Sequence, residues 1–292
     1  MRYSLFLGCT IPARQVNYEL STRQVARALG VELIDGDFGC CGFPIESIDE
    51  VKALAMAAAN LKNAADLGLE VVTLCSACNE MLNKTEEMLA KETTKLDKVN
   101  TLLKKQIGAE YENERPRVRH FTRMLYESFG VVKIRAMVKK PLNGLKAAVH
   151  YGCHYLRPST LYEGFDDPEF PKSLDELVKA TGAESIDYLG KNDCCGGGLL
   201  AVNEGVAKRM TQKKLNTISK LDIDCIVLIC PFCGIMYDRY QSLIAAESDK
   251  GYKIPVLYYP QLLGLALGIE TQKLGFDTNS VKVDELLERM GF

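Results

Sequence analysis

Short apolar runs alternate with longer amphipathic segments along the first part of the chain. The runs at 4–7, 31–34 and 70–74 have the length of buried strands. The segments 15–29 and 47–67 between them repeat their apolar residues every three or four positions, which is typical of amphipathic helices. Strands that alternate with helices in this way predict a parallel sheet within an α/β fold.

The two predicted helices carry further signals. Val16, Leu20, Val25 and Leu29 fall on one side of the first helix, and we expect this side to be buried. The sequence Ser47-Ile48-Asp49-Glu50 matches a capping box at the start of the second helix, which is rich in alanine. Each strand would then end just before a cysteine-containing segment, at the edge where sites form in open parallel sheets.

The middle of the chain is more polar. Residues 79–107 are rich in lysine and predict a solvated helix, or a pair of helices, along one edge of the fold. A basic loop is expected at 115–120, followed by a short helix that continues to Phe129. Residues 131–145 contain proline and glycine and are the best candidate for a linker.

The second half of the chain repeats the first. A second capping box at 173–176 opens a helix, whereas the loop 157–171 has no counterpart in the first half. The expected strands are 146–151, 185–189, 226–229 and 254–258, and the later helices end near 220 or span 235–246, 261–267 and the segment after 281. The predicted fold class is therefore α/β, with two Rossmann-like βαβαβ lobes, residues 1–140 and 141–292, related by a pseudo-two-fold axis.

The composition is that of an ordinary soluble globular protein. Of 292 residues, 47% are hydrophobic and 25% are charged, and the formal net charge of −2 gives no indication of binding to nucleic acid or to a bilayer surface. No apolar run approaches the roughly 18 residues that a membrane span needs. The apolar stretch at the N-terminus is too short for a signal peptide. We expect a cytoplasmic protein whose thiols stay reduced.

Ten of the eleven cysteines fall into two matching sets of five. Each set has a single cysteine, then an adjacent pair followed by glycine, then Cys-x-x-Cys, and the pattern recurs after about 150 residues as an internal repeat. The first set is Cys9, Cys40, Cys41, Cys75 and Cys78, and the second set is Cys153, Cys194, Cys195, Cys230 and Cys233. The eleventh, Cys225, lies in an apolar run, and we interpret it as a buried cysteine.

The adjacent cysteines require a sharp bend in the chain. Neighbouring side chains in extended backbone point to opposite sides, so both thiols can face one centre only if the chain turns there. Gly42 and Gly196 directly follow the two pairs, and they permit such a turn because glycine has no Cβ.

The spacing does not favour all kinds of cysteine chemistry equally. Disulfides suit small secreted domains, and zinc takes four ligands where each set offers five. Thiolates also select iron–sulfur centres, which we favour, although an ordinary cubane takes four cysteines that are usually closely spaced. Five thiolates indicate either a cubane with a spare thiol or a larger centre with bridging sulfurs. A redox-active Cys-x-x-Cys pair of the thioredoxin type is a further alternative.

The pattern C-x(n)-CCG-x(n)-C-x-x-C, present twice, resembles the cysteine-rich CCG domain. Two tandem CCG domains that begin with a strand and Gly-Cys resemble the B subunit of heterodisulfide reductase, and the resemblance covers nearly the whole chain. It implies two noncubane [4Fe-4S] clusters, each held by one five-cysteine set, so that all ten cysteines are metal ligands. One departure is that three glycines, Gly196 to Gly198, follow the second pair where one follows the first.

The resemblance also implies an activity and partners. The activity is reduction of the mixed disulfide of coenzyme M and coenzyme B, with one electron delivered from each cluster. The partners are two other subunits of the same reductase, a ferredoxin-like iron–sulfur C subunit with a flavin-containing A subunit behind it. CCG domains also occur in iron–sulfur subunits of succinate, lactate and glycolate oxidoreductases, so an electron-transfer subunit of that type is the alternative.

Other residues are candidates for roles around such clusters. His154, beside the first cysteine of the second set, is our candidate catalytic residue, as a proton donor or a hydrogen-bond partner of cluster sulfide. The alternative for His154 is an ordinary surface histidine. His150, on the preceding strand, is interpreted as a residue at the edge of the core. Arg14, Arg157 and Lys191 are the candidate cations for the sulfonate, carboxylate and phosphate groups of the two coenzymes.

Overall fold

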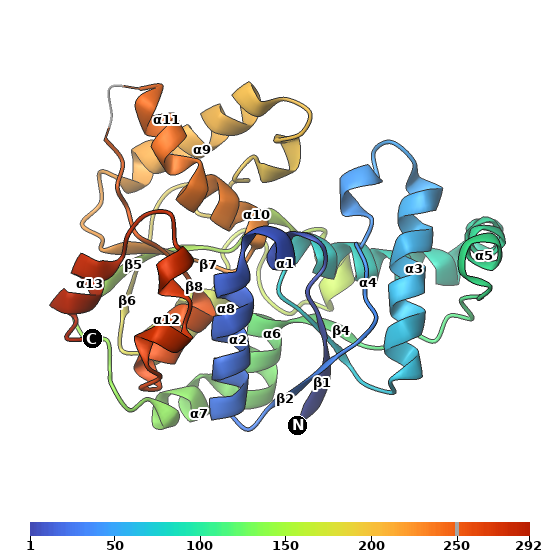
Figure 1. Ribbon diagram of the computed structural model, residues 1–292, viewed down its shortest axis with the longest axis horizontal. Coiled ribbons are helices and arrows are strands. Elements are labelled where there is room, and N and C mark those ends of the chain that lie inside the picture. Colours follow the sequence, from blue (N-terminus) through green and yellow to red (C-terminus); the bar gives the residue numbers. More distant parts are fainter. Residues whose placement is uncertain (249–250) are drawn as a thin grey trace.

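The computed structural model describes residues 1–248 and 251–292, which form two parallel four-stranded sheets (Figure 1). The first sheet contains β1 (Arg2–Phe6), β2 (Glu32–Asp35), β3 (Val71–Thr73) and β4 (Val118–His120), and the second contains β5 (Lys146–His150), β6 (Glu184–Ile186), β7 (Cys225–Leu228) and β8 (Val256–Tyr258). Their strand orders, β2-β1-β3-β4 and β6-β5-β7-β8, are the same. The predicted α/β fold with two similar lobes is confirmed. We call the first sheet with its helices the first lobe, and the second sheet with its helices the second lobe.

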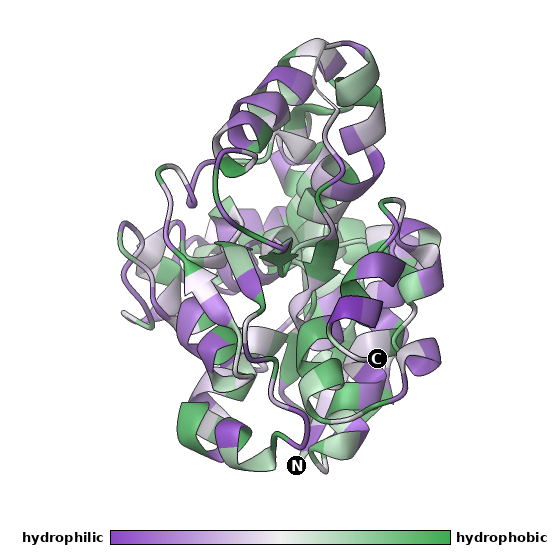
Figure 2. Cartoon of the chain, turned by 90° about the vertical axis from the view of Figure 1, so that its left-hand side faces the viewer, coloured by the Kyte–Doolittle hydropathy of each residue, from purple (hydrophilic) through white to green (hydrophobic). Residues whose placement is uncertain are grey.

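Helices separate the strands in both lobes. The first lobe contains α1 (Thr10–Arg14), α2 (Val16–Ala28), α3 (Glu50–Asp66), α4 (Ser76–Lys91), α5 (Thr93–Ile107), α6 (Phe121–Met124) and α7 (Gly130–Met137). The second lobe contains α8 (Ser173–Ala180), α9 (Glu204–Ile218), α10 (Pro231–Gly234), α11 (Gln241–Ala246), α12 (Tyr259–Ala266) and α13 (Asp284–Arg289). Hydrophobic residues concentrate on the central strands and hydrophilic residues on the outer helices (Figure 2). Among the described residues, no helix has both the length and the apolar character to cross a membrane.

The lobes pack against each other through two reciprocal pairs of helices. α2, which follows β1, packs against α12, which follows β8, and the two helices lie side by side in Figure 1. In the same way α8, which follows β5, packs against α7, which follows β4. Each lobe thus contributes one helix from the segment after its first strand and one from the segment after its last strand, which is the reciprocity that a pseudo-two-fold axis produces.

Buried polar contacts hold the α2 side of this interface. The Asn17 side chain donates to Asn279 Oδ1 at 3.0 Å, and Tyr18 Oη donates to the carbonyl oxygen of Ile229 at 2.9 Å. The predicted buried face of this helix is therefore wrong in part, because Val16 and Leu20 are exposed while Asn17 and Tyr18 are buried. The helix packs through hydrogen-bonding side chains that a hydrophobic pattern does not register.

The middle of the chain also differs from prediction. The pair of helices is confirmed as α4 and α5, but α4 is not a solvated helix, because residues 76–82 are all buried. Its first turns pack against the short 3-10 helix Cys153–Tyr155 of the second lobe. The predicted basic loop contains β4, in which Arg119 is buried between Glu70 and Glu127 at 2.6 and 2.9 Å. The paired carboxylates offset the cost of burying that cation.

The linker and the two capping boxes need correction too. Residues 131–145 begin with α7, whose contact with α8 makes it part of the interface, so the division at 140 and 141 stays a prediction. Helix α3 is capped by Asp49, which accepts from Lys52 N, and not by Ser47. The start of α8 is capped from outside the predicted box, since Asp166 accepts from Ser173 N at 2.9 Å.

Candidate metal centre

The cysteines lie after the carboxyl ends of the strands. Cys75 and Cys230 follow β3 and β7 and stand directly before α4 and α10. Cys9 follows β1 through Gly8, whose φ is +63°, and a Cβ on Gly8 would lie 3.0 Å from the sulfur of Cys78. Glycine at this position therefore lets the Cys-x-x-Cys segment approach the first strand.

The predicted bends after the adjacent cysteines are confirmed. Gly42 and Gly196 have φ values of +91° and +89°, a region that side chains with a Cβ rarely adopt. A Cβ on Gly42 would lie 2.5 Å from the carbonyl oxygen of Ala53, and one on Gly196 would lie 2.7 Å from that of Ala207. Both turns thus press the backbone against the following helix at equivalent positions.

The thiols form one row of interacting neighbours that runs through both lobes, and at one end Cys153 Sγ lies 3.7 Å from Cys194 Sγ. The pairing of Cys75 with Cys230 joins the two sets at the middle of the row. The order is Cys9, Cys40, Cys41, Cys78, Cys75, Cys230, Cys233, Cys195, Cys194 and Cys153. Among residues 1–248 and 251–292, no three His, Cys, Asp or Glu side chains converge on a point that would hold a single metal ion.

The electrostatics of this row fit a positively charged centre. Contacts with neighbouring thiols lower the pKa of Cys41, Cys194 and Cys230. The pKa of each of the other seven thiols in the row is raised, so most of the row stays protonated when only protein surrounds it. Ten thiolates could coexist here only around bound metal, which deprotonates a coordinating thiol outright. The donor set is the soft sulfur that iron–sulfur centres use.

His154 lies at the boundary of the two lobes. Its Nδ1 is 3.7 Å from Glu80 Oε2 on α4, and its ring meets that of Phe43 edge-on at 4.9 Å. Burial lowers the pKa of His154 and raises the pKa of Glu80 to about 7. The predicted catalytic residue thus has a protonatable partner from the other lobe, and its catalytic role stays a prediction.

Sequence reasoning missed the surroundings of the second set. His150 is fully buried, not at the edge of the core, and its Nε2 lies 3.2 Å from the sulfur of Cys233. Lys214, also buried, lies 3.0 Å from His150 Nδ1 and donates to the carbonyl oxygen of Asp193 at 2.8 Å. The available signal was spacing: Lys214 follows Cys195 by as many residues as Asn60 follows Cys41.

Asn60 hydrogen-bonds to the backbone beside the first cysteine pair, as Lys214 does beside the second. Gly39 N donates to Asn60 Oδ1 at 2.8 Å, and Asn60 Nδ2 donates to the carbonyl oxygen of Cys40 at 3.0 Å. A neutral amide thus fastens the first cysteine loop to α3, whereas an ammonium group fastens the second to α9.

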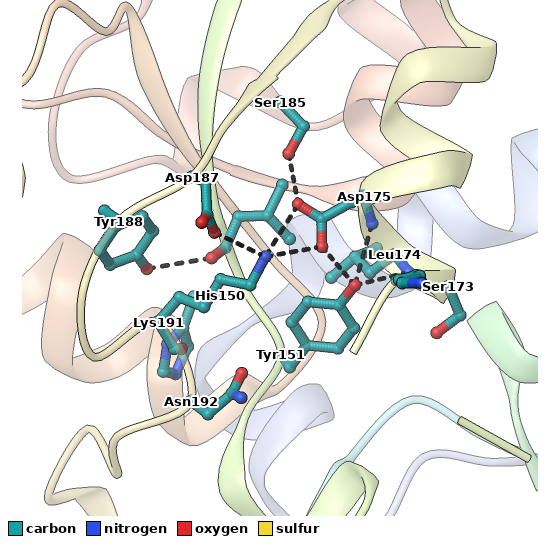
Figure 3. Close-up of polar contacts among 12 residues, drawn as sticks. His150, Tyr151, Ser173, Leu174, Asp175, Ser185, Asp187, Tyr188, Lys191 and Asn192 are labelled. Atoms are coloured by element: carbon teal, nitrogen blue, oxygen red, sulfur yellow. Dashed lines mark hydrogen bonds and ion pairs between the residues drawn. The ribbon is translucent and has the colours of Figure 1, made fainter. Parts of the chain in front are cut away.

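Two of the three candidate cations have partners among the described residues. Lys191 lies between Asp175 and Asp187, at 3.1 Å from a carboxylate oxygen of each (Figure 3). Arg157 bonds within its own loop, to Glu169 at 3.1 Å. Arg14 lines a cavity of about 240 Å³ at the end of α1. These arrangements leave Arg14 as the strongest of the three candidates for an anionic substrate group, and all three roles stay predictions.

The cavities differ in whether a cysteine lines them. One cavity of about 910 Å³ lies between the segment 251–255 and α13, and no cysteine lines it. A smaller cavity of about 370 Å³ is lined by Cys194 together with Met210, Lys213 and Lys214, so the second set is reached from this side. Cys225 is fully buried on β7, as predicted.

Comparison with solved structures supports the fold. A hypothetical protein from Helicobacter pylori superposes with a TM-score of 0.80 over 97% of this chain, at 18% sequence identity. The match covers 52% of that protein's chain, so this chain spans about half of its length.

Comparison with sequence families and curated proteins identifies the family. The family described as CCG, cysteine-rich domain, matches residues 3–83 and 147–238. The B subunit of the ferredoxin:CoB-CoM heterodisulfide reductase of Methanosarcina mazei is 37% identical, over 99% of this chain and 97% of its own. The 8-methylmenaquinol:fumarate reductase membrane anchor subunit of Wolinella succinogenes is 33% identical, over 97% of this chain and 98% of its own. The chain therefore belongs to the family of tandem CCG-domain proteins that includes the B subunit of heterodisulfide reductase.

Proposed function

We propose that this chain is the disulfide-reducing iron–sulfur subunit of a heterodisulfide reductase. Its substrate would be the mixed disulfide of coenzyme M and coenzyme B, which takes up two electrons and two protons and yields two thiols. The observation that carries the proposal is the row of ten thiols, five from each lobe, in a chain that is 37% identical to a relative named for this activity.

The ten cysteines would hold two noncubane [4Fe-4S] clusters, one for each set. Bound there, the clusters would supply one electron each and Lewis-acidic iron for the departing sulfur. The protein's part would be to fix the ligands, and the glycine turns after Cys41 and Cys195 would allow adjacent thiols to face one centre. The contact between Cys75 and Cys230 holds the two sets next to each other, so that one disulfide would be reached from both.

His154 is the residue that we propose as the proton donor. It borders the second set through Cys153, and its ring packs on Phe43, which follows the adjacent cysteines of the first set. A proton on this imidazole would reach a product sulfur without crossing bulk water, and Glu80 would orient the ring. Electrons would come from the ferredoxin-like C subunit, with the flavin-containing A subunit behind it, and the assembly would be cytoplasmic.

The test is anaerobic purification followed by counting of iron and sulfide and by assay. We expect both elements in amounts that correspond to two clusters, an EPR signal of the oxidised protein that changes when coenzyme M or coenzyme B is added, and consumption of the heterodisulfide with a one-electron dye as reductant. Protein with zinc in place of iron, or protein stripped of iron that still reduces the disulfide, would contradict the proposal.

A second candidate is favoured by one observation, the 33% identity to a subunit of a quinol:fumarate reductase. In that role the clusters would relay electrons between a quinol and a partner protein, and the chain would bind no thiol. The same EPR experiment separates the two, because a relay predicts spectra that are indifferent to both coenzymes.

A further inference from the structure

The two cysteine sets have different electrostatic surroundings. Lys214 is buried, and its ammonium group has three acceptors within hydrogen-bond distance: the carbonyl oxygens of Lys191 and Asp193 at 3.1 and 2.8 Å, and His150 Nδ1 at 3.0 Å. An ammonium group has three N–H donors and no acceptor, so these three contacts satisfy it fully. A buried, fully hydrogen-bonded cation is a fixed charge rather than a mobile surface lysine.

This cation determines which nitrogen of His150 carries the proton. His150 Nδ1 lies 3.0 Å from the Lys214 ammonium and 3.2 Å from the carbonyl oxygen of Lys191. Because the ammonium only donates, and already donates to that carbonyl, we assign Nδ1 as an acceptor and place the ring proton on Nε2. Nε2 is 3.2 Å from the sulfur of Cys233, so it donates to that sulfur. The edge of the Tyr237 ring packs against the imidazole at 5.0 Å and keeps it in place. Lys214 thus acts on the second set both through its charge and through a directed hydrogen bond.

The first lobe lacks both features at the matching positions. Phe6 precedes Cys9 by as many residues as His150 precedes Cys153, and a phenyl ring donates no hydrogen bond to sulfur. Asn60 stands in the place of Lys214, and it fastens the cysteine loop without a charge. The match of positions is supported by the turns, since Gly42 and Gly196 meet Ala53 and Ala207, each seven residues before Asn60 or Lys214.

We propose that Lys214 and His150 are positioning residues that raise the reduction potential of the second cluster. This inference rests on the proposed function, because it requires the two clusters. Reduction adds negative charge to a cluster, and a nearby cation and hydrogen bonds to its sulfurs both favour the reduced form. Burial lowers the pKa of Lys214 to about 8, so the group is still mostly protonated at neutral pH, and it interacts with Cys233, Cys195 and Cys194. Asp193 also interacts with it and offsets part of its charge. The two clusters are therefore inequivalent, and the second takes up an electron at a higher potential than its cysteines alone would set.

The test is an EPR-monitored redox titration of the anaerobic full-length protein and its variants. Lys214→Met removes the charge at similar length, and we expect the ratio of reduced to oxidised second cluster at a fixed potential to fall at least about tenfold, which is about 59 mV for one electron. His150→Phe copies the first lobe, and we expect a fall of about threefold or more without loss of the ammonium. Lys214→Arg keeps the charge and should stay close to the unmodified protein.

The reduction potential of each cluster is compared between the variants and the unmodified protein, and not between the two clusters. The reason is that Cys9 is exposed, so solvent also affects the potential of the first cluster. Cys41→Ala and Cys195→Ala, each expected to remove one cluster, assign the signals. Asn60→Met is the matched control, which loosens the first cysteine loop without changing charge and should shift neither cluster strongly. The inference is overturned if both clusters form and the second keeps its potential in Lys214→Met and His150→Phe, or if Asn60→Met shifts the first cluster as far. Absence of clusters from the unmodified protein would instead overturn the proposed function, and this inference with it.

Discussion

The two lobes share a strand order and a cysteine pattern, but they differ in what surrounds the thiols. In the first lobe Phe6 and Asn60 flank the set, and in the second lobe His150 and Lys214 stand at the matching positions. The helix that begins within Cys-x-x-Cys is continuous in α4 of the first lobe, whereas in the second lobe a π-helical turn, Ile235–Arg239, stands between α10 and α11. The two lobes thus share their backbone fold and their cysteines, and they differ in the residues that surround the cysteines. A symmetric scaffold of this kind presents two similar centres with different properties.

The largest expected effect comes from removing one cysteine of either adjacent pair. Under the proposed function, Cys41→Ala or Cys195→Ala would each lower the iron content by about half, because each cysteine serves one cluster. Iron and sulfide counting after anaerobic purification measures this. Loss of all iron from either variant would show that the sets do not assemble separately, which the contact of Cys75 with Cys230 makes worth testing.

Cys225→Ala is the control for this experiment. Cys225 is fully buried on β7 but lies outside the row of thiols. We expect a loss of about 1 kcal/mol of stability from the small cavity, with the iron content unchanged. A drop in iron for this variant would mean that general loosening of the second lobe explains the result for Cys195→Ala.

Substitution of the turn glycine by alanine should lower the stability by a similar amount in the two lobes. Gly42→Ala and Gly196→Ala would each place a methyl group against a helix carbonyl at a positive φ, and we expect each to cost about 3 kcal/mol. Urea unfolding of the two variants measures the free energy of unfolding directly. Gly198→Ala is the matched control, because its Cβ would meet only Phe43 at 3.9 Å. Unequal costs for Gly42→Ala and Gly196→Ala would mean that the two turns are less alike than their backbone angles indicate.

The sequence predicted the parts of the molecule that repeat. The two five-cysteine sets, the strands before them and the glycine turns follow from local pattern, because each is fixed by nearby residues and recurs twice. The interface between the lobes was missed, since Asn17 and Tyr18 are buried by partners more than two hundred residues away. Burial of α4 was missed for the same reason, as its polar surface is covered by the second lobe.

The burial of the residues around the thiols could not be predicted from the sequence, although the spacing of Lys214 from Cys195 matches that of Asn60 from Cys41. Lys214 lies on α9, an amphipathic helix with several lysines, and a lysine on such a helix is ordinarily at the surface. Only the position of α9 against the loop of Lys191 and Asp193 reveals that its ammonium group is buried. The contact of His150 with Cys233 likewise joins β5 to α10, the helix that follows β7, and no local pattern specifies that β5 and β7 pair.

A change in stability smaller than that of the glycine variants is expected at Glu86 of the first lobe, whose matching position in the second lobe is Gln241. Glu86 on α4 follows Cys78 by as many residues as Gln241 follows Cys233, and one carboxylate oxygen of Glu86 is buried without a hydrogen-bond partner. Burial raises the pKa of Glu86 to about 8. A carboxyl group whose folded-state pKa lies above its unfolded value binds its proton more tightly when folded, so its contribution to stability is present below about pH 4.5 and is lost as the pH rises to about 8. Glu86→Gln, which copies the second lobe, should therefore leave stability unchanged at pH 4 and raise it by about 2 kcal/mol at pH 9.

Urea unfolding of the Glu86→Gln variant at both pH values measures this gain, with Glu87→Gln as the matched control on the same helix. Glu87 pairs with Lys91 near the surface, so its substitution should change stability by about 0.5 kcal/mol or less at either pH. An equal gain for both variants would indicate relief of general negative charge on α4, and a gain for Glu86→Gln that does not grow with pH would remove the buried carboxylate as its cause. A gain in stability that occurs only in Glu86→Gln and grows between pH 4 and pH 9 would show that the lobes also differ in the electrostatics of this helix, and not only around the thiols.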